Sequence, residues 1–195
     1  MAKTNYWRIE MKIRSTLVFL LFTIVMFSVV ACEKSNKQAA QTPDKQATVK
    51  PMAGQSDRQP AYNFTLKTLT GNSVGLNDFQ GKVLIVDFWD TWCPPCKAEI
   101  PHFVDLYSEY NSQGLEILGV AFGRDGVSAV RNFIGSYGIN YQNALGNQEV
   151  VTGFGGFNSI PTTFVIDKQG NIYKKYTGYR DKSVFEADIK ALLNS

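Results

Sequence analysis

Two near-continuous apolar segments dominate the hydrophobic pattern of the chain. Val83–Trp89 and Leu115–Phe122 lack the alternation of a half-buried strand, so both predict strands buried on two faces, as at the centre of a parallel sheet. Between them, apolar residues recur at helical spacing: Ile100, Phe103, Val104 and Tyr107. The pattern therefore predicts a strand, a helix beginning near Pro94 and a second parallel strand, joined by a right-handed crossover.

Two hairpins are predicted on either side of this unit. Asn63–Leu66 and Ser73–Leu76 alternate apolar and polar residues around a Thr-Gly-Asn turn, which predicts an N-terminal β-hairpin at an edge of the sheet. Thr162–Ile166 and Ile172–Tyr176 flank an Asp-Lys-Gln-Gly turn and predict a second antiparallel hairpin.

Helical spacing predicts three further helices. One carries Val127, Val130, Ile134 and Tyr137, and a short one spans Gln148–Phe154. The last is expected to open with Ser183 and Glu186 at capping-box spacing. Its apolar residues are expected to face the core, namely Phe185, Ile189 and Leu192. This order of elements predicts an α/β fold with a central mixed sheet flanked by helices.

Residues 1–31 have the layout of an export signal. Ser15–Ala31 is an uncharged, mostly apolar run of about 17 residues behind two basic residues. It ends directly before Cys32 in a pattern that resembles the bacterial lipobox, so Cys32 is the expected site of lipid attachment. An uncleaved membrane anchor is the alternative, because such a run is at the short end of what spans a bilayer. Met11 lies just before the basic residues, so a native start at Met11, with residues 1–10 as an upstream extension, stays open beside a start at Met1.

Residues 32–59 contain no aromatic residue and are rich in Gln, Lys, Ala and Ser, which predicts a disordered tether. Residues 60–195 are rich enough in large apolar residues to form one folded domain. The formal net charge is only +3 and no basic cluster is interleaved with aromatic residues, which argues against nucleic-acid binding. We therefore expect a membrane-anchored domain in the cell envelope, outside the cytoplasm.

The candidate chemistry lies in Cys93-Pro94-Pro95-Cys96, where a buried strand meets a helix. Backbone N–H groups and the helix dipole stabilise a thiolate at that point and lower the pKa of Cys93, so Cys93 is the expected nucleophile. Cys96 lies one turn further into the helix and suits a resolving thiol. The two prolines bring no N–H, so donors to the sulfur must come from Cys96 and Lys97, and this moderate stabilisation favours a reductant over a strong oxidant.

Other roles for the two cysteines are weaker interpretations. A zinc site needs four ligands, and the sequence has no second cysteine pair. His102, the only histidine, is expected to be an ordinary helix-face residue. A purely structural disulfide stays open as an alternative. We expect no metal and no cofactor.

The segment Val86–Pro101 resembles the active-site segment of the thioredoxin superfamily, and most closely its TlpA/ResA-like branch of membrane-anchored, extracytoplasmic reductases. The similarity covers about Ala61 to Leu193 and implies a thioredoxin-like fold with a central insertion near Val127–Phe154. Ile160–Asp167 is similar to the cis-proline loop of the family. The resemblance implies that Pro161 is cis and lies beside the cysteines, with the Ile160 backbone available to a substrate strand.

Two acids are candidates for moving the proton of Cys96. Asp87 matches the buried acid of thioredoxin, where many members of the anchored branch have Asn. Glu99 matches an acid that has an assigned proton-transfer role in the anchored branch. Asp90 replaces a small residue usual in the family, and its charge is expected to raise the pKa of Cys93. Trp92, like Trp89, is expected either to offer a docking surface beside the dithiol or to belong to the core.

Together these features predict a thiol-disulfide oxidoreductase that reduces protein disulfides. Its partners are expected to be disulfide-containing client proteins and, as the resemblance implies, a membrane thiol electron donor and apocytochrome c as a candidate client. One alternative is a thiol peroxidase, which typically has a Thr-containing loop three residues before its cysteine, where this chain has Asp90. The other is a non-catalytic binding lipoprotein in which the disulfide is structural.

Overall fold

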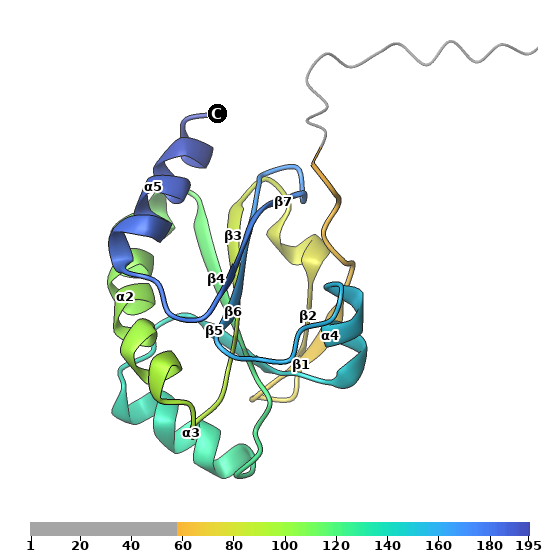
Figure 1. Cartoon of the computed structure of the whole chain (residues 1–195), viewed down its shortest axis with the longest axis vertical. Helices are drawn as coiled ribbons and strands as arrows, with labels where there is room; N and C mark the ends of the chain where they lie inside the picture. The colour runs from red at the N-terminus through yellow and green to blue at the C-terminus, as the bar shows by residue number, and fades with distance from the viewer. Residues whose placement is uncertain (1–57) are drawn as a thin grey trace, which may run out of the picture. The chain divides into compact units, whose positions relative to one another are not determined.

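The computed structural model describes residues 58–195 (Figure 1). The predicted signal segment, Cys32 and nearly all of the predicted tether lie outside the described residues. Within the described part, none of the helices has both the length and the apolar composition that crossing a membrane requires. The contacts of the domain begin two residues before the predicted boundary, because Arg58 forms an ion pair with Asp167 at 3.0 Å and Gln59 accepts a backbone hydrogen bond from Ile172 at 2.8 Å.

One mixed sheet of seven strands organises residues 58–195, in the order β2-β1-β5-β4-β3-β6-β7 (Figure 1). The strands are β1 Thr65–Thr68, β2 Ser73–Gly75, β3 Val83–Trp89, β4 Leu115–Ala121, β5 Gln142–Leu145, β6 Thr162–Ile166 and β7 Ile172–Thr177. The α-helices are α2 Pro94–Tyr110, α3 Val127–Ser136, α4 Gln148–Gly153 and α5 Lys182–Leu193, and the 3-10 turns are Leu76–Phe79 and Asn111–Gln113.

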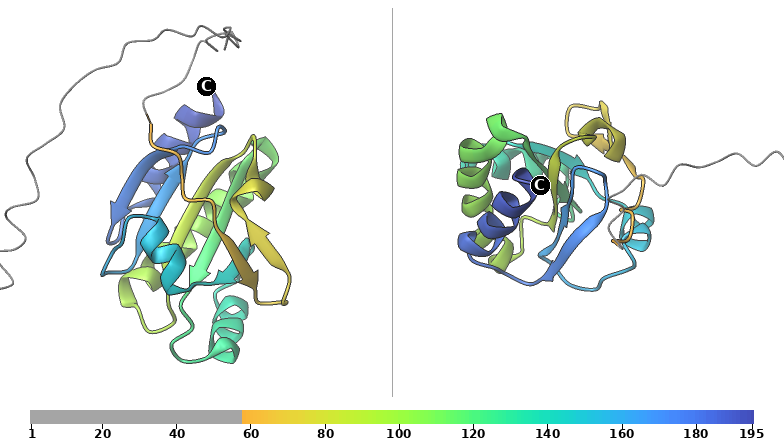
Figure 2. Two further views of the ribbon diagram at one scale, coloured as in Figure 1. Left: turned by 90° about the vertical axis from the view of Figure 1, so that its right-hand side faces the viewer. Right: turned by 90° about the horizontal axis from the view of Figure 1, so that it is seen from above.

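The two apolar runs form the centre of this sheet, as predicted. β3 and β4 pair in parallel from Val83 opposite Leu115 to Trp89 opposite Ala121, and every residue of β3 is buried. α2, α3 and α5 contribute to the core on one face, while α4 and the N-terminal hairpin pack against the other (Figures 1 and 2). Helices on both faces explain why these strands are apolar throughout.

The predicted thioredoxin-like α/β fold is confirmed, and both predicted hairpins are present. β1 pairs with β2, and β6 pairs with β7, in each case antiparallel. The segment predicted as a central insertion contains α3, β5 and α4, and β5 joins the N-terminal hairpin to β4. The pattern missed β5, because its four residues Gln-Asn-Ala-Leu carry neither alternation nor β-branched side chains.

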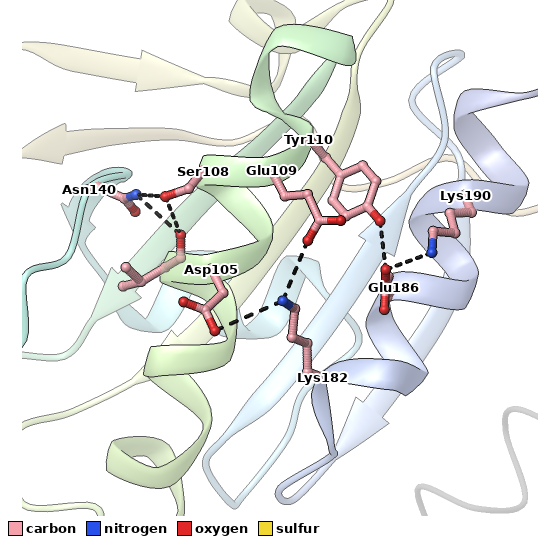
Figure 3. Close-up of polar contacts among 9 residues, drawn as sticks. Asp105, Ser108, Glu109, Tyr110, Asn140, Lys182, Glu186 and Lys190 are labelled. Carbon is pink, nitrogen blue, oxygen red and sulfur yellow. Dashed lines mark hydrogen bonds and ion pairs between the residues drawn. The ribbon is translucent and has the colours of Figure 1, made fainter.

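The predicted capping box of α5 is wrong. The N-cap lies two residues earlier, at Asp181, and Ser183 is already inside the helix. Glu186 instead accepts hydrogen bonds from Tyr110 and Lys190, both at 2.6 Å, so it ties α5 to α2 (Figure 3). The Glu186 side chain, which the local sequence pattern predicted to cap the helix, therefore makes tertiary contacts instead. The inward residues of α5 are buried as predicted, namely Phe185, Ile189 and Leu192.

Gly119 in β4 lies against a buried hydrogen bond that joins the sheet to the insertion. Nε1 of Trp89 donates to Oδ1 of Asn143 at 3.1 Å, and a Cβ on Gly119 would lie 2.2 Å from that oxygen. We expect Gly119→Ala to lower the free energy of unfolding by about 2 kcal/mol, because the added methyl displaces Asn143. Urea unfolding of both proteins measures this.

Gly135→Ala is the matched control for this prediction. Gly135 lies inside α3, and an added Cβ there meets no atom within 4 Å. Its stability should stay equal or rise by up to about 1 kcal/mol, because alanine is the better helix former. Equal stability of Gly119→Ala and the wild type would contradict the prediction.

Candidate active site

Cys93 and Cys96 form a disulfide where β3 passes into α2. Their Cα atoms are 5.3 Å apart, and Cys93 is the N-cap residue of the helix. The backbone N–H of Cys96 donates to Sγ of Cys93 at 3.3 Å. Cys93 keeps an exposed fraction of 2%, whereas Cys96 has none. The first cysteine is therefore the one that a partner could reach, and a helix N–H is already directed at its sulfur.

The loop before β6 lies directly beside this disulfide. The Ile160–Pro161 peptide bond is cis, as the resemblance implied. Sγ of Cys93 is 3.6 Å from the carbonyl oxygen of Ile160. The cause of this approach is the antiparallel pairing of β6 with β3, which places Thr162 opposite Phe88 near the end of β3. The carbonyl of Pro161 accepts a hydrogen bond from the N–H of Gly178 at 2.8 Å, which joins the loop to the end of β7.

Asp87 and Glu99 lie close together in the core, linked by Thr163, a residue that sequence reasoning did not single out. Thr163 stands directly opposite Asp87 in the β3–β6 pairing. Its Oγ1 is 3.1 Å from Oδ1 of Asp87 and 3.5 Å from Oε2 of Glu99. The other oxygen of Glu99 accepts the backbone N–H of Arg180 at 2.7 Å. Oδ2 of Asp87 has no hydrogen-bond partner among residues 58–195.

Burial controls the acidity of this cluster. It raises the pKa of Asp87 well above its usual range, and the neighbouring Glu99 charge adds to the rise, while the Thr163 hydrogen bond opposes it. Burial also raises the pKa of Glu99 to about 7, against the opposing hydrogen bonds of Arg180 and Thr163. Burial, followed by the charges of both acids, raises the pKa of Tyr141, whose hydroxyl lacks a partner within the described domain.

Asp90 is almost fully buried, and its carboxylate accepts backbone hydrogen bonds from two loops. Oδ1 accepts the N–H of Thr91 at 2.8 Å, and Oδ2 accepts the N–H of Arg124 at 3.1 Å. Thr91 in turn donates to Asp125 at 2.7 Å. Asp90 therefore joins the turn before Cys93 to the loop after β4. Its expected effect on the pKa of Cys93 stays a prediction.

The two tryptophans beside the dithiol have different surroundings. Trp89 is fully buried and belongs to the core, whereas Trp92 is 46% exposed, with the guanidinium of Arg124 5.4 Å from its ring centre. Trp92 and Ile160 line a cavity of about 310 Å³ next to the disulfide, together with Phe122, Gln148, Val151, Phe157, Asn158 and Ser159. Of the two tryptophans, only Trp92 is exposed enough to take part in a docking surface.

His102 is the remaining candidate residue, and metal binding is the remaining candidate role. His102 is half-buried on α2 and packs 5.8 Å from the ring of Tyr179. Across the described residues, no group of three or more His, Cys, Asp or Glu is arranged to hold a metal ion.

A thioredoxin-like sheet with a dithiol at a helix N-terminus beside a cis-proline defines a thiol-disulfide oxidoreductase of thioredoxin fold. A model of the AhpC/TSA family matches residues 58–175. The chain is 37% identical over 129 residues to thiol-disulfide oxidoreductase ResA of Bacillus subtilis, covering 66% of this chain and 72% of that protein. It is 33% identical over 132 residues to ResA of Bacillus anthracis, covering 68% and 76%.

Solved structures agree with these sequence matches. A thiol:disulfide interchange protein of the thioredoxin family from Chlorobium tepidum TLS superposes with a TM-score of 0.66 at 33% identity, covering 72% of this chain and 99% of that one. The chain therefore belongs to the AhpC/TSA family and, within it, to the thiol-disulfide oxidoreductases related to ResA. A purely structural role for the disulfide is set aside.

The raised pKa of Glu99 predicts a pH-dependent stability. An acid whose pKa is raised from 4.5 to about 7 in the folded protein binds more protons there than in the unfolded chain. Stability should therefore be highest below pH 4.5 for this group and fall as the pH rises through about 7, by on the order of 3 kcal/mol. Urea unfolding of the oxidised protein between pH 4 and pH 8 tests this.

Two variants isolate the contribution of Glu99. Glu99→Gln should reduce the dependence over that pH range and leave the part that comes from Asp87, whereas Glu109→Gln, an exposed acid on the same helix, should leave it in place. An unchanged slope in Glu99→Gln would show that this carboxylate is not the cause.

Proposed function

We propose that this enzyme works outside the cytoplasm and reduces disulfides in client proteins. The thiolate of Cys93 attacks one client sulfur, and the other client sulfur leaves as a thiolate. Cys96 then attacks the sulfur of Cys93, forms the Cys93–Cys96 disulfide and releases the second client thiolate. The two electrons gained by the client come from the dithiol. The observation that carries this proposal is the Cys93–Cys96 disulfide at the tip of α2 beside cis-Pro161.

The division of labour between the cysteines follows from their positions. Cys93 keeps the small exposed fraction and receives the Cys96 N–H, so its thiolate is both reachable and stabilised. Cys96 is enclosed and can attack only a sulfur brought to Cys93. Its proton must move to a nearby base before that attack, and we assign this role to the buried acids Asp87 and Glu99.

The client is expected to bind as an extended segment beside the cis-proline loop. Ile160 offers its backbone there, and the exposed ring of Trp92 offers apolar contact at the edge of the adjoining cavity. Disulfide-containing proteins are therefore the proposed substrate class. Apocytochrome c disulfides are a client to be tested first, because of the resemblance to the TlpA/ResA-like branch.

The direction of electron flow is supported by the weak donor set around Cys93. Pro94 and Pro95 supply no N–H, so the reduced form gains little extra stabilisation. A dithiol of this kind gives electrons to clients and must be re-reduced, for which we propose a membrane thiol protein as the donor. The sequence of residues 15–31 followed by Cys32 supports a lipid anchor and a location in the cell envelope.

The direction of transfer predicts a low reduction potential for the Cys93–Cys96 pair. We expect a value close to that of thioredoxin, about −270 mV, rather than the value of about −120 mV found for the strong oxidant DsbA. Equilibration of the purified domain with glutathione or dithiothreitol buffers, read by thiol alkylation, measures it. A value near the oxidant's would reverse the proposed direction.

The client and location predictions are tested together by trapping. Cys96→Ser should accumulate mixed disulfides between Cys93 and client proteins, because the second attack is removed, whereas Cys93→Ser on the same background should accumulate none. These complexes should be in the membrane fraction and carry clients from outside the cytoplasm. Adding Cys32→Ala should abolish lipid labelling and release the complexes from the membrane. Cytoplasmic clients, or membrane retention without Cys32, would count against the proposed location and anchor.

A further inference from the structure

The hydroxyl of Thr163 is the feature from which we draw a further inference. It lies between two carboxyl groups that come from different elements, Asp87 on β3 and Glu99 on α2. All three residues are almost completely buried, with 1% of each exposed. In the part of the chain that the structure describes, this hydroxyl is the only side-chain group that hydrogen-bonds to both acids.

Counting protons shows what this arrangement can do. Thr163 has one hydroxyl proton and therefore donates to one of the two acids at a time, while its oxygen can accept from the other. Glu99 has its second oxygen committed to the N–H of Arg180. The second oxygen of Asp87 is buried without a donor anywhere in residues 58–195. Asp87 thus has one oxygen facing Thr163 and one that is free to take a proton.

A protonated Asp87 cannot act as a base while it keeps its proton. Burial and the nearby Glu99 raise the pKa of Asp87 well above its usual range, which favours its neutral form relative to an ordinary aspartate. Glu99 has a pKa of about 7 and can accept a proton there. An ionised Glu99 can therefore accept a proton across Thr163, on the opposite side from the free oxygen of Asp87.

We propose that Thr163 is a positioning residue that transfers a proton from Asp87 to Glu99 when Cys96 resolves the mixed disulfide. The inference rests on the proposed function. Asp87 Oδ1 gives its proton to Thr163 Oγ1 as the Thr163 proton passes to Glu99 Oε2. Asp87 Oδ2 then takes the proton of the Cys96 thiol. Overall, Cys96 loses one proton and Glu99 gains one. Asp87 and Thr163 return to their original protonation states, and no electrons are transferred.

Other charged or titratable groups also face the two acids. Tyr141, just before β5, and Tyr179 and Arg180, after β7, interact electrostatically with one or both of them. Thr163 differs from these groups because it touches both carboxyl groups and has no charge of its own to change. Replacing its hydroxyl therefore cuts the link between the acids and adds or removes no charged residue, although it also removes the hydrogen bonds that lower the pKa of both acids.

The test follows a reaction in which both chemical steps can be seen. Reduced enzyme is mixed with a disulfide-linked peptide pair and acid-quenched at short times, and mass spectrometry measures how much Cys93–peptide mixed disulfide is present. Formation of this species reports attack by Cys93, and its decay reports resolution by Cys96. The measurement is repeated from pH 5 to pH 9.

Thr163→Val should slow the decay of the mixed disulfide by at least about tenfold near pH 7 and move its pH profile to higher pH, because the shared proton path is lost. Formation should stay unchanged. Thr163→Ser, which keeps the hydroxyl, should restore the wild-type profile. Thr68→Val is the matched control, because Thr68 is a buried hydroxyl of the same sheet on β1 and bonds to Asn72 instead. Wild-type decay in Thr163→Val would overturn the proposal.

A second comparison separates a proton path from a simple hydrogen bond to Asp87. Glu99→Gln should slow decay in the wild-type background by about tenfold and have no further effect in Thr163→Val. Equal effects in both backgrounds would overturn the inference. In the unmodified enzyme, decay in mixed light and heavy water should show more than one proton in motion, and a single-proton dependence would also overturn it. Absence of any mixed disulfide in the wild type would contradict the proposed function instead.

Discussion

The antiparallel pairing of β3 with β6 is the constraint on which the active site depends. This pairing brings the cis-proline loop to the end of β3, beside the helix tip that holds the dithiol. The same pairing sets Thr163 opposite Asp87, which lies six residues before Cys93 in the sequence. A shift of one residue would turn every side chain of β6 to the other face of the sheet. Such a shift would exchange Phe164 and Ile166, which pack in one core, with Val165, which packs in the other, and these specific packing contacts therefore fix the register.

Two acids in the core would normally be a liability to the fold. An unpaired buried carboxylate is expensive, so such groups survive only with hydrogen bonds or with their proton retained. Here the limited donor set, one hydroxyl and one backbone N–H, satisfies the pair only in part. The same burial raises the pKa of both acids, that of Glu99 to about 7.

Much of the fold could be predicted from the sequence because the strongest patterns coincide with the most buried elements. β3, β4, α2 and the two hairpins follow from apolar runs, helical spacing and turn residues. β5 could not be predicted, because it is short and is stabilised mainly by its neighbours, with Asn143 bonded to Trp89. Glu186 was misassigned for a similar reason, since a contact with Tyr110 from another helix outweighs the local cap.

The site was predictable only in part. Cys93, Cys96 and Pro161 could be recognised because their roles are tied to motifs that are local in sequence. The involvement of Thr163 and Arg180 depends on strand register and on a backbone N–H, neither of which has a sequence signature. The expected charge effect of Asp90 was argued from proximity along the chain, whereas the structure gives that carboxylate a further partner on a distant loop.

The carboxylate of Asp90 has a mechanical consequence for the surface that a client meets. It holds the N–H of Thr91 on one loop and that of Arg124 on another, from a position with 1% of the residue exposed. Pulling the loops apart would strand a negative charge in an apolar setting. Trp92 follows Thr91 and Arg124 belongs to the other loop, so one buried carboxylate fixes the spacing of the two side chains that border the dithiol, and separating the two loops breaks at least one of its hydrogen bonds.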